Sequence, residues 1–117
     1  MVDAGHNPAV VVSPGARLNH PVIPKSVALG IVEDFEFTAG RFHLAPGTTL
    51  LLYTDGATDA RSSADEIFGV DRLMAAIRSA DASPAALVSS VTTTIDAFAT
   101  GAPQEDDITL LAISRPE

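Results

Sequence analysis

The fold of this chain is decided by Leu50-Leu51-Leu52-Tyr53-Thr54-Asp55-Gly56, an apolar run that ends on a carboxylate and a glycine. A second acidic cluster, Glu105-Asp106-Asp107, directly precedes another short apolar run at residues 108–113. Both runs have the length and composition of β-strands. Hard divalent cations bind several oxygen ligands held on rigid elements, so two strand ends that each present aspartate can form a cation site. The sequence therefore predicts a cation site where these two strand ends meet.

The composition is that of one acidic globular domain. Among 117 residues, 46% are hydrophobic and 19% are charged, which is typical of a chain that buries a core. The net charge of −8 leaves no basic stripe for nucleic acid. There is no cysteine, which excludes disulfides, thiolate zinc sites and a cysteine nucleophile. No apolar run reaches the roughly 20 residues that span a bilayer, and the N-terminus lacks a signal pattern. We expect a cytoplasmic protein with no membrane partner.

Strands are expected in several parts of the chain. Residues Ala9 to Val12 form a β-branched run that stops at the turn signal Ser13-Pro14-Gly15. Partial period-2 alternation predicts one or two half-buried strands between Val32 and Leu44. The runs Thr49 to Tyr53 and Ile108 to Ile113 complete the expected strands.

Two helices are expected between the last two strands. Val70, Leu73, Met74 and Ile77 have the i, i+3, i+4, i+7 spacing of one apolar helical stripe. Ser83-Pro84 offers an N-cap and a first-turn proline for a second helix that continues to about Phe98. The fold class is therefore α+β, with two helices on one face of a mostly antiparallel sheet.

Asp55 has several readings when it is taken alone. An Asp-Gly pair after a strand is often a simple turn. A calcium loop from Asp55 to Glu66 lacks the expected ligand at Ala57 and the expected glycine at Ala60. An aspartyl-phosphate nucleophile usually needs a second acid at the position of Ala57 and a downstream lysine, and the chain has neither. The calcium loop and the nucleophile are therefore disfavoured, whereas the turn and the cation ligand stay open.

The other candidate residues are also open to simpler readings. Asp106 and Asp107 are adjacent, so in a strand only one of them can point into the cleft of Asp55. A solvated loop end is the alternative for this pair. His6 could be a general acid or a metal ligand, but a lone histidine near glycine and proline more often packs in a loop. His20 and His43 are too scattered to form a histidine triad with it.

Taken together, the chain resembles the C-terminal half of the PPM-type (type 2C) metal-dependent protein phosphatases, in the SpoIIE/RsbU-like branch. The resemblance covers nearly the whole sequence in the order of the family motifs. The matching segments are Asp3-Ala4-Gly5-His6-Asn7-Pro8, Leu29-Gly30-Ile31, Leu44-Ala45-Pro46-Gly47, Leu51-Leu52-Tyr53-Thr54-Asp55-Gly56-Ala57-Thr58-Asp59-Ala60, Phe68-Gly69-Val70-Asp71-Arg72-Leu73 and Asp106-Asp107-Ile108-Thr109-Leu110-Leu111.

This resemblance implies an α-β-β-α sandwich with two Mn²⁺ or Mg²⁺ ions in a cleft. It implies hydrolysis of phosphoserine or phosphothreonine by metal-activated water. Asp55 and Asp106 match metal ligands, and Gly56, Asp107, His6 and Asn7 match positions near the cleft. The implied substrate is a phosphorylated regulatory protein such as an anti-sigma-factor antagonist, in sigma-factor or stress-response control. The alternative is a non-catalytic, protein-binding remnant of such an enzyme.

One departure from the family pattern lowers the expected activity. The first half of the family domain carries a Gly-Asp segment whose aspartate bridges both metals, and residues 1–117 show no counterpart of it. We therefore expect at most one weakly bound ion and little activity from these residues alone. Half a sandwich also exposes sheet edges and an apolar face. Either the helices repack over that face or another copy of the chain covers it, and we expect a homo-oligomer.

Overall fold

A single antiparallel sheet forms the centre of the computed structural model, which describes residues 1–117. The sheet has four strands in the order β2-β1-β3-β4, and every pair of neighbours is antiparallel. The strands are β1 (Val10–Ser13), β2 (Arg17–Asn19), β3 (Thr48–Tyr53) and β4 (Leu110–Arg115). Three of them lie where the sequence predicts strands, shifted by one or two residues, whereas no strand is predicted at β2.

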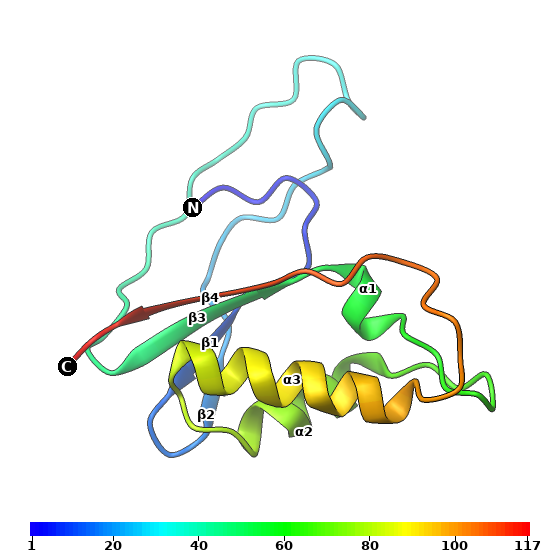
Figure 1. Cartoon of the computed structure of the whole chain (residues 1–117). Coiled ribbons are helices and arrows are strands. Elements are labelled where there is room, and N and C mark those ends of the chain that lie inside the picture. The colour runs from blue at the N-terminus through cyan, green and yellow to red at the C-terminus, as the bar shows by residue number, and fades with distance from the viewer.

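Three helices accompany the sheet: α1 (Asp55–Thr58), α2 (Gly69–Arg78) and α3 (Pro84–Phe98). Figure 1 shows α2 and α3 together on one face of the sheet, with the single-turn α1 at its end. The α+β class and the two helices on one face are confirmed, and α1 is an addition to them. None of the three helices combines the length and the apolar character needed to cross a bilayer.

The long helices start and pack as their sequences predict. The Ser83 hydroxyl accepts a hydrogen bond from the Ala86 amide at 3.3 Å, which satisfies one of the free N–H groups of the first turn of α3. Pro84 occupies the first helical position, where its missing N–H costs nothing. In α2, Leu73 and Ile77 are fully buried one turn apart and belong to the hydrophobic core.

The hydrophobic core lies between the sheet and the two long helices. Alternate residues of β1 and β3 point into it, as the pleat of a strand requires. Leu50, on the other face of β3, is also buried, so β3 is covered on both sides for most of its length. The core cluster consists of Val10, Val12, Leu51, Tyr53, Ala57, Phe68, Leu73, Ala76, Ile77, Leu87, Val91 and Ile95.

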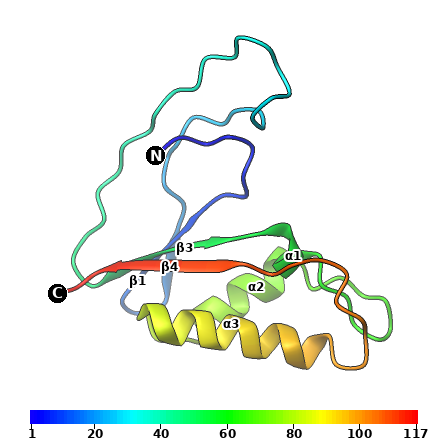
Figure 2. The same cartoon turned by 45° about the horizontal axis from the view of Figure 1, so that its top comes forward.

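The segment from residue 20 to residue 47, here called the arch, carries no regular strand. Figures 1 and 2 show it rising with the N-terminus from the sheet face opposite the helices. The expectation of strands between Val32 and Leu44 is therefore wrong, and only an isolated bridge links Ala39 to Val2. The rings of Phe35 and Phe37 pack edge to face with their centroids 5.0 Å apart, so the two side chains cover part of each other's apolar surface without a sheet.

Candidate functional site

The backbone of β3 and β4 continues to pair beyond the strands and brings the two acidic segments together. The Thr54 amide donates to the Thr109 carbonyl at 3.1 Å. In return, the Thr109 amide donates to the Thr54 hydroxyl oxygen at 3.0 Å. That hydroxyl donates in turn to the Asp107 carbonyl at 3.4 Å. Asp55 and the acidic cluster around Asp106 therefore lie at the same end of the sheet.

Gly56 lets helix α1 touch the loop that precedes β4. It is buried, and a Cβ atom built on it would lie only 2.1 Å from the Asp107 carbonyl oxygen. The sequence predicts that Gly56 allows a close approach, with a ligand as the expected neighbour. The structure shows the backbone of Asp107 as a close neighbour. The glycine thus serves the contact between the two acidic segments.

A third segment, the loop before β1, fixes the Asp55 side chain. The Asn7 side-chain amide donates to the Asp55 Oδ1 atom at 2.6 Å. The loop is folded by the Asp3 carboxylate, which accepts hydrogen bonds from the amides of Gly5 at 2.8 Å and His6 at 3.0 Å. Gly5 has a φ of 84°, which favours glycine. This local folding explains how a residue 48 positions away in the sequence reaches Asp55.

The other predicted cleft residues are placed less closely. Asp107 contributes its backbone carbonyl to the contact with Thr54, while its side chain is exposed. The imidazole of His6 is exposed and makes no hydrogen bond. His6 lines a hollow of about 830 Å³ together with Asn7 and Leu52, on the arch side of the sheet. The structure therefore gives Asn7 a partner in the site and gives His6 none.

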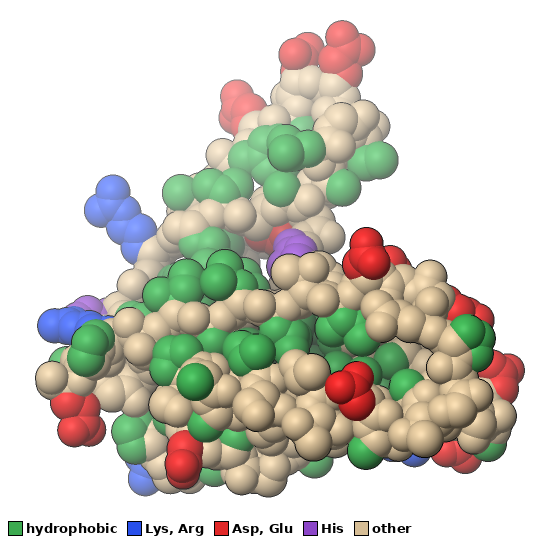
Figure 3. Space-filling view, viewed as in Figure 1, with side chains coloured by type: hydrophobic (Ala, Val, Ile, Leu, Met, Phe, Trp, Pro, Cys, Tyr) green, Lys and Arg blue, Asp and Glu red, His purple; other side chains and the backbone are tan.

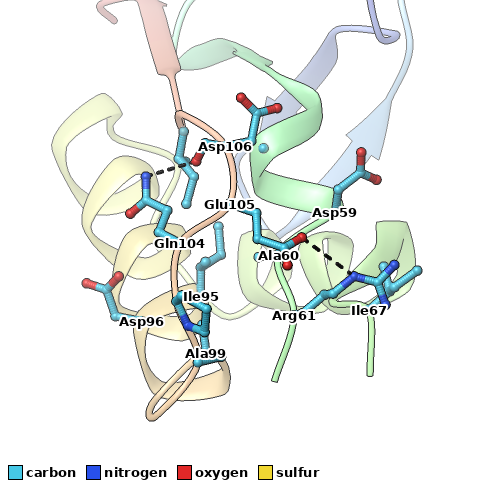
Figure 4. Close-up of a pocket in the computed structure, with 14 residues that line it drawn as sticks. Asp59, Ala60, Arg61, Ile67, Ile95, Asp96, Ala99, Gln104, Glu105 and Asp106 are labelled. Atoms are coloured by element: carbon cyan, nitrogen blue, oxygen red, sulfur yellow. Dashed lines mark hydrogen bonds and ion pairs between the residues drawn. The ribbon is translucent and has the colours of Figure 1, made fainter. Parts of the chain in front are cut away.

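An acidic pocket of about 620 Å³ opens beside Asp106, between α1, α3 and the loop before β4. Figure 4 shows Asp106 next to α1, with Asp59 at the end of that helix. Arg61 pairs with Glu105 at 4.0 Å and with Asp65 at 3.2 Å. The pocket is lined by Gly56, Asp59, Ala60, Arg61, Ile67, Ile95, Asp96, Ala99, Ala102, Pro103, Gln104, Glu105, Asp106 and Ile108. Four carboxylates against one guanidinium give it a negative potential, which attracts cations.

Tyr53 is a core residue whose pKa depends in part on the charge of Asp55. It is the last residue of β3 and is only 4% exposed. Burial raises the pKa of the Tyr53 hydroxyl above its usual value of 10.0, and the nearby negative charge of Asp55 raises it further. Both effects disfavour a phenolate, so Tyr53 stays protonated and acts as a core residue.

The donor set within this chain supports only part of a metal site. Asp55 and Asp106 could supply two oxygen ligands from adjacent segments, whereas Mg²⁺ and Mn²⁺ favour six. No group of three or more histidine, cysteine, aspartate or glutamate side chains is arranged to hold an ion. The residues of this chain therefore do not make up a complete divalent-cation site by themselves.

Sequence reasoning missed two residues that shape this site. Thr54 joins the two strand ends through its hydroxyl, whereas the sequence analysis places it only in the segment after the strand and gives it no role. Asp3 folds the loop that presents Asn7. An Asp followed two residues later by glycine is a recognised turn signal, so Asp3 could have been found. The role of Thr54 depends on a partner 55 residues away and has no local signal.

Comparison with known proteins gives a consistent family. The family model of Stage II sporulation protein E (SpoIIE) matches residues 1–116. The chain is 31% identical over 114 residues to Protein IcfG of Synechocystis sp., covering 97% of this chain and 18% of IcfG. The SiaA-PP2C domain of Pseudomonas aeruginosa matches with a TM-score of 0.70 and 23% identity, covering 91% of this chain and 42% of that one.

The phosphatase domain of the cell fate determinant SpoIIE from Bacillus subtilis, presoaked with Mn, also matches. Its TM-score is 0.70 at 14% identity, covering 99% of this chain and 49% of that one. The chain thus spans less than half the length of these relatives. Because the family model matches nearly every residue, the chain belongs to the SpoIIE family, and it shares its fold with the matched PP2C phosphatase domains.

Proposed function

We propose that this chain is the C-terminal part of a metal-dependent protein phosphatase that hydrolyses phosphoserine or phosphothreonine. One observation carries the proposal: the hydrogen bonds between Thr54, Asp107 and Thr109 hold Asp55 and the Asp106 segment at one end of the sheet. The family membership and the negative potential of the adjacent pocket support it. The substrate we propose is a phosphorylated regulatory protein such as an anti-sigma-factor antagonist.

The residues of this chain would position and bind rather than react. A bound Mn²⁺ or Mg²⁺ would supply an activated water and neutralise charge on the phosphoryl group. Asp55 would offer one carboxylate oxygen, because Asn7 already holds the other at a fixed position. Asp106 would offer a second carboxylate from the facing loop. Thr54 and Gly56 keep the two carboxylates on adjacent segments, which is the preorganisation that a rigid ion site requires.

Activity of these 117 residues alone is expected to be absent. The reason is the donor count, since two carboxylates hold a divalent ion weakly. The first test is hydrolysis of p-nitrophenyl phosphate by the chain in Mn²⁺, where we expect no rate above the blank. Robust hydrolysis that disappears in Asp55→Asn would contradict this expectation and would show that the site is complete.

Calorimetric titration with Mn²⁺ tests the ligands themselves. We expect a small heat for the wild type, a loss of that heat in Asp106→Ala, and no change in Asp81→Ala. Asp81 is an exposed carboxylate between α2 and α3, so it controls for the loss of one negative charge. If the wild type gives no heat, the metal-site proposal fails.

A second candidate function is a non-catalytic, protein-binding module. The observation that favours it is the absence of any group of three or more metal-ligating side chains. It predicts that Asp55→Asn and Asp106→Ala leave binding to a regulatory protein partner unchanged, whereas the phosphatase proposal predicts that both substitutions abolish metal binding.

A further inference from the structure

The carboxylate of Asp55 depends on one other side chain for its direction. Asp55 is exposed, and the 2.6 Å hydrogen bond from the Asn7 amide is the only hydrogen bond or ion pair that its carboxylate makes. An amide that donates to a carboxylate makes a charge-assisted bond, which is stronger than a bond between two neutral groups. The bond selects one rotamer of a side chain that is otherwise free to turn in solvent. Asn7 therefore sets how Asp55 is presented.

Asn7 depends in turn on the loop before β1, whose residues 3–8 form no regular secondary structure. On the side of β1, Pro8 restricts the backbone of Asn7 to extended conformations. On the other side, the Asp3 carboxylate accepts the amides of Gly5 and His6 and so shapes the turn that leads to Asn7. The place of Asn7 is thus set by Pro8 and by Asp3.

The arch holds this loop by direct contact. The Ser26 hydroxyl donates a hydrogen bond to the Asp3 carbonyl oxygen. This is the only hydrogen bond between residues 3–8 and residues 20–28, which we call the first leg of the arch. A Cβ atom built on Gly5 would lie 2.7 Å from the Ala28 backbone nitrogen, so the two backbones also touch there. The first leg therefore holds the loop at two points.

The other leg of the arch packs against the same unit. The Gly40 amide donates to the Met1 carbonyl oxygen at 2.8 Å. A Cβ atom built on Gly40 would lie 2.9 Å from the Ile23 Cα atom, so the two legs touch each other. Figure 3 shows the lower part of the arch joined to the body of the molecule, while its acidic tip stands clear of it. The loop that carries Asn7 and the lower part of the arch thus form one packed unit.

We propose that Asn7 is the positioning residue of Asp55, and that Ser26 of the arch holds Asn7 in place through Asp3. The first link is the hydroxyl of Ser26 on the Asp3 carbonyl, and the second is the turn that the Asp3 carboxylate folds. The last link is the amide of Asn7 on Asp55. This inference rests on the proposed function, in which Asp55 binds the cation. A contact that displaces the first leg of the arch would then change the affinity for that cation.

NMR of the Asn7 side-chain amide tests the positioning without any metal. The short, charge-assisted bond to Asp55 should move one of the two amide protons downfield. Asp55→Ala removes the acceptor and gives the position of the unbonded amide. We expect the Asn7 signals of Ser26→Ala to move toward that position. Ser26→Thr keeps the hydroxyl and should restore the wild-type position.

Ser90→Ala is the matched control. The Ser90 hydroxyl also donates to a distant backbone carbonyl, that of Ala76 at 3.1 Å, and Ser90 is half-buried like Ser26. The control therefore loses the same kind of bond, between α3 and α2, and should leave the Asn7 signals where they are. Circular dichroism checks that each variant is folded.

Mn²⁺ binding, followed by the electron paramagnetic resonance of the free ion, tests the consequence for the site. Residues that orient a metal ligand typically change metal affinity by 10–100-fold, so Asn7→Ala should weaken Mn²⁺ binding by about tenfold. Ser26→Ala should weaken it less, and Ser90→Ala should leave it unchanged. Because Ser26 acts through Asn7, Ser26→Ala should have no further effect in a chain that already carries Asn7→Ala.

The outcomes separate this inference from the proposed function. Asn7 signals that are the same in Ser26→Ala as in the wild type overturn the inference, because the arch then does not hold Asn7. Equal Mn²⁺ affinity of Asn7→Ala and the wild type also overturns it, as do losses that add up in the double variant. If the wild type binds no Mn²⁺, the proposed cation site fails, and the Asn7 signals alone decide whether Ser26 sets the presentation of Asp55.

Discussion

Replacing Gly56 with alanine sets two well-known effects against each other. Gly56 lies in helix α1, and alanine is favoured over glycine in a helix by about 1 kcal/mol. Propensity alone therefore predicts a more stable protein. However, the new Cβ atom would lie 2.1 Å from the Asp107 carbonyl oxygen, and carbon–oxygen contacts are usually about 3.3 Å. The loop or the helix must move by roughly 1 Å to relieve the overlap.

The magnitude follows from what this movement disturbs. Overpacking of a close contact typically costs about 1–3 kcal/mol. The displaced Asp107 also pulls on the bonds that Thr54 makes to Asp107 and Thr109, each worth about 1 kcal/mol. After the helix-propensity gain is subtracted, Gly56→Ala should lower the free energy of unfolding by about 1–3 kcal/mol.

Urea denaturation followed by circular dichroism measures this change. Gly30→Ala is a reference without steric overlap, because the Cβ position of Gly30 has open space around it. Its φ of 81°, which the helical Gly56 does not share, is expected to cost about 1 kcal/mol on its own. Amide chemical shifts of Asp107 and Thr109 should change in Gly56→Ala and stay constant in Gly30→Ala. If Gly56→Ala is as stable as the wild type or more stable, the close contact between α1 and the loop is refuted.

Three further predictions concern single side chains. Tyr53 is the only tyrosine and tryptophan is absent, so near-ultraviolet titration reports its pKa directly. That pKa should lie above 10.0 and fall in Asp55→Asn, but not fully to 10.0, because burial is the larger cause. With rising pH, Tyr53 loses its proton in the unfolded chain before it does so in the folded chain. Tyr53 therefore does not change the free energy of unfolding below about pH 10 and lowers it at higher pH. Tyr53→Phe should abolish this pH-dependent loss of stability in denaturation curves measured at several pH values. Thr54→Val removes the acceptor for the Thr109 amide and should lower the free energy of unfolding by about 1–2 kcal/mol in urea denaturation. The control is Thr93→Val, at an exposed position of α3 without a side-chain hydrogen bond, which should lower it by less than half as much. Ser83→Ala removes the cap of α3 and should lower the melting temperature by an amount that corresponds to about 1 kcal/mol, with Ser89→Ala, an exposed mid-helix position, as the unaffected reference.

The elements that sequence reasoning placed correctly carry their own local signals. Strand β3 is a continuous apolar run, and α3 is opened by Ser83 and Pro84, so periodicity and capping suffice to place them. The arch was misread because the alternation of Phe35 and Phe37 is consistent with a half-buried strand. Whether such a run becomes a strand depends on a neighbouring strand to pair with, and the sequence does not specify that neighbour.

The site was only partly predictable for the same reason. Asp55 and the acidic cluster could be recognised as strand ends that present carboxylates. Their meeting depends on pairing across a separation of more than 50 residues, and on Asn7 reaching Asp55 from a third segment. The close approach at Gly56 was predicted, but the sequence did not indicate the Asp107 backbone as a neighbour. Long-range backbone contacts of this kind have no local pattern from which they can be read.

The register between β3 and β4 has a consequence for how this protein can change its length during evolution. Tyr53 lies opposite Leu110, and this match sets which acids meet at the end of the sheet. Inserting or deleting one residue between Asp106 and Leu110 would rotate the acidic side chains to the opposite face, since side chains alternate along a strand. The loop around Gly101, between α3 and the acidic cluster, has no such constraint. Length variation among natural relatives should therefore concentrate near Gly101 and be absent between Asp106 and Leu110.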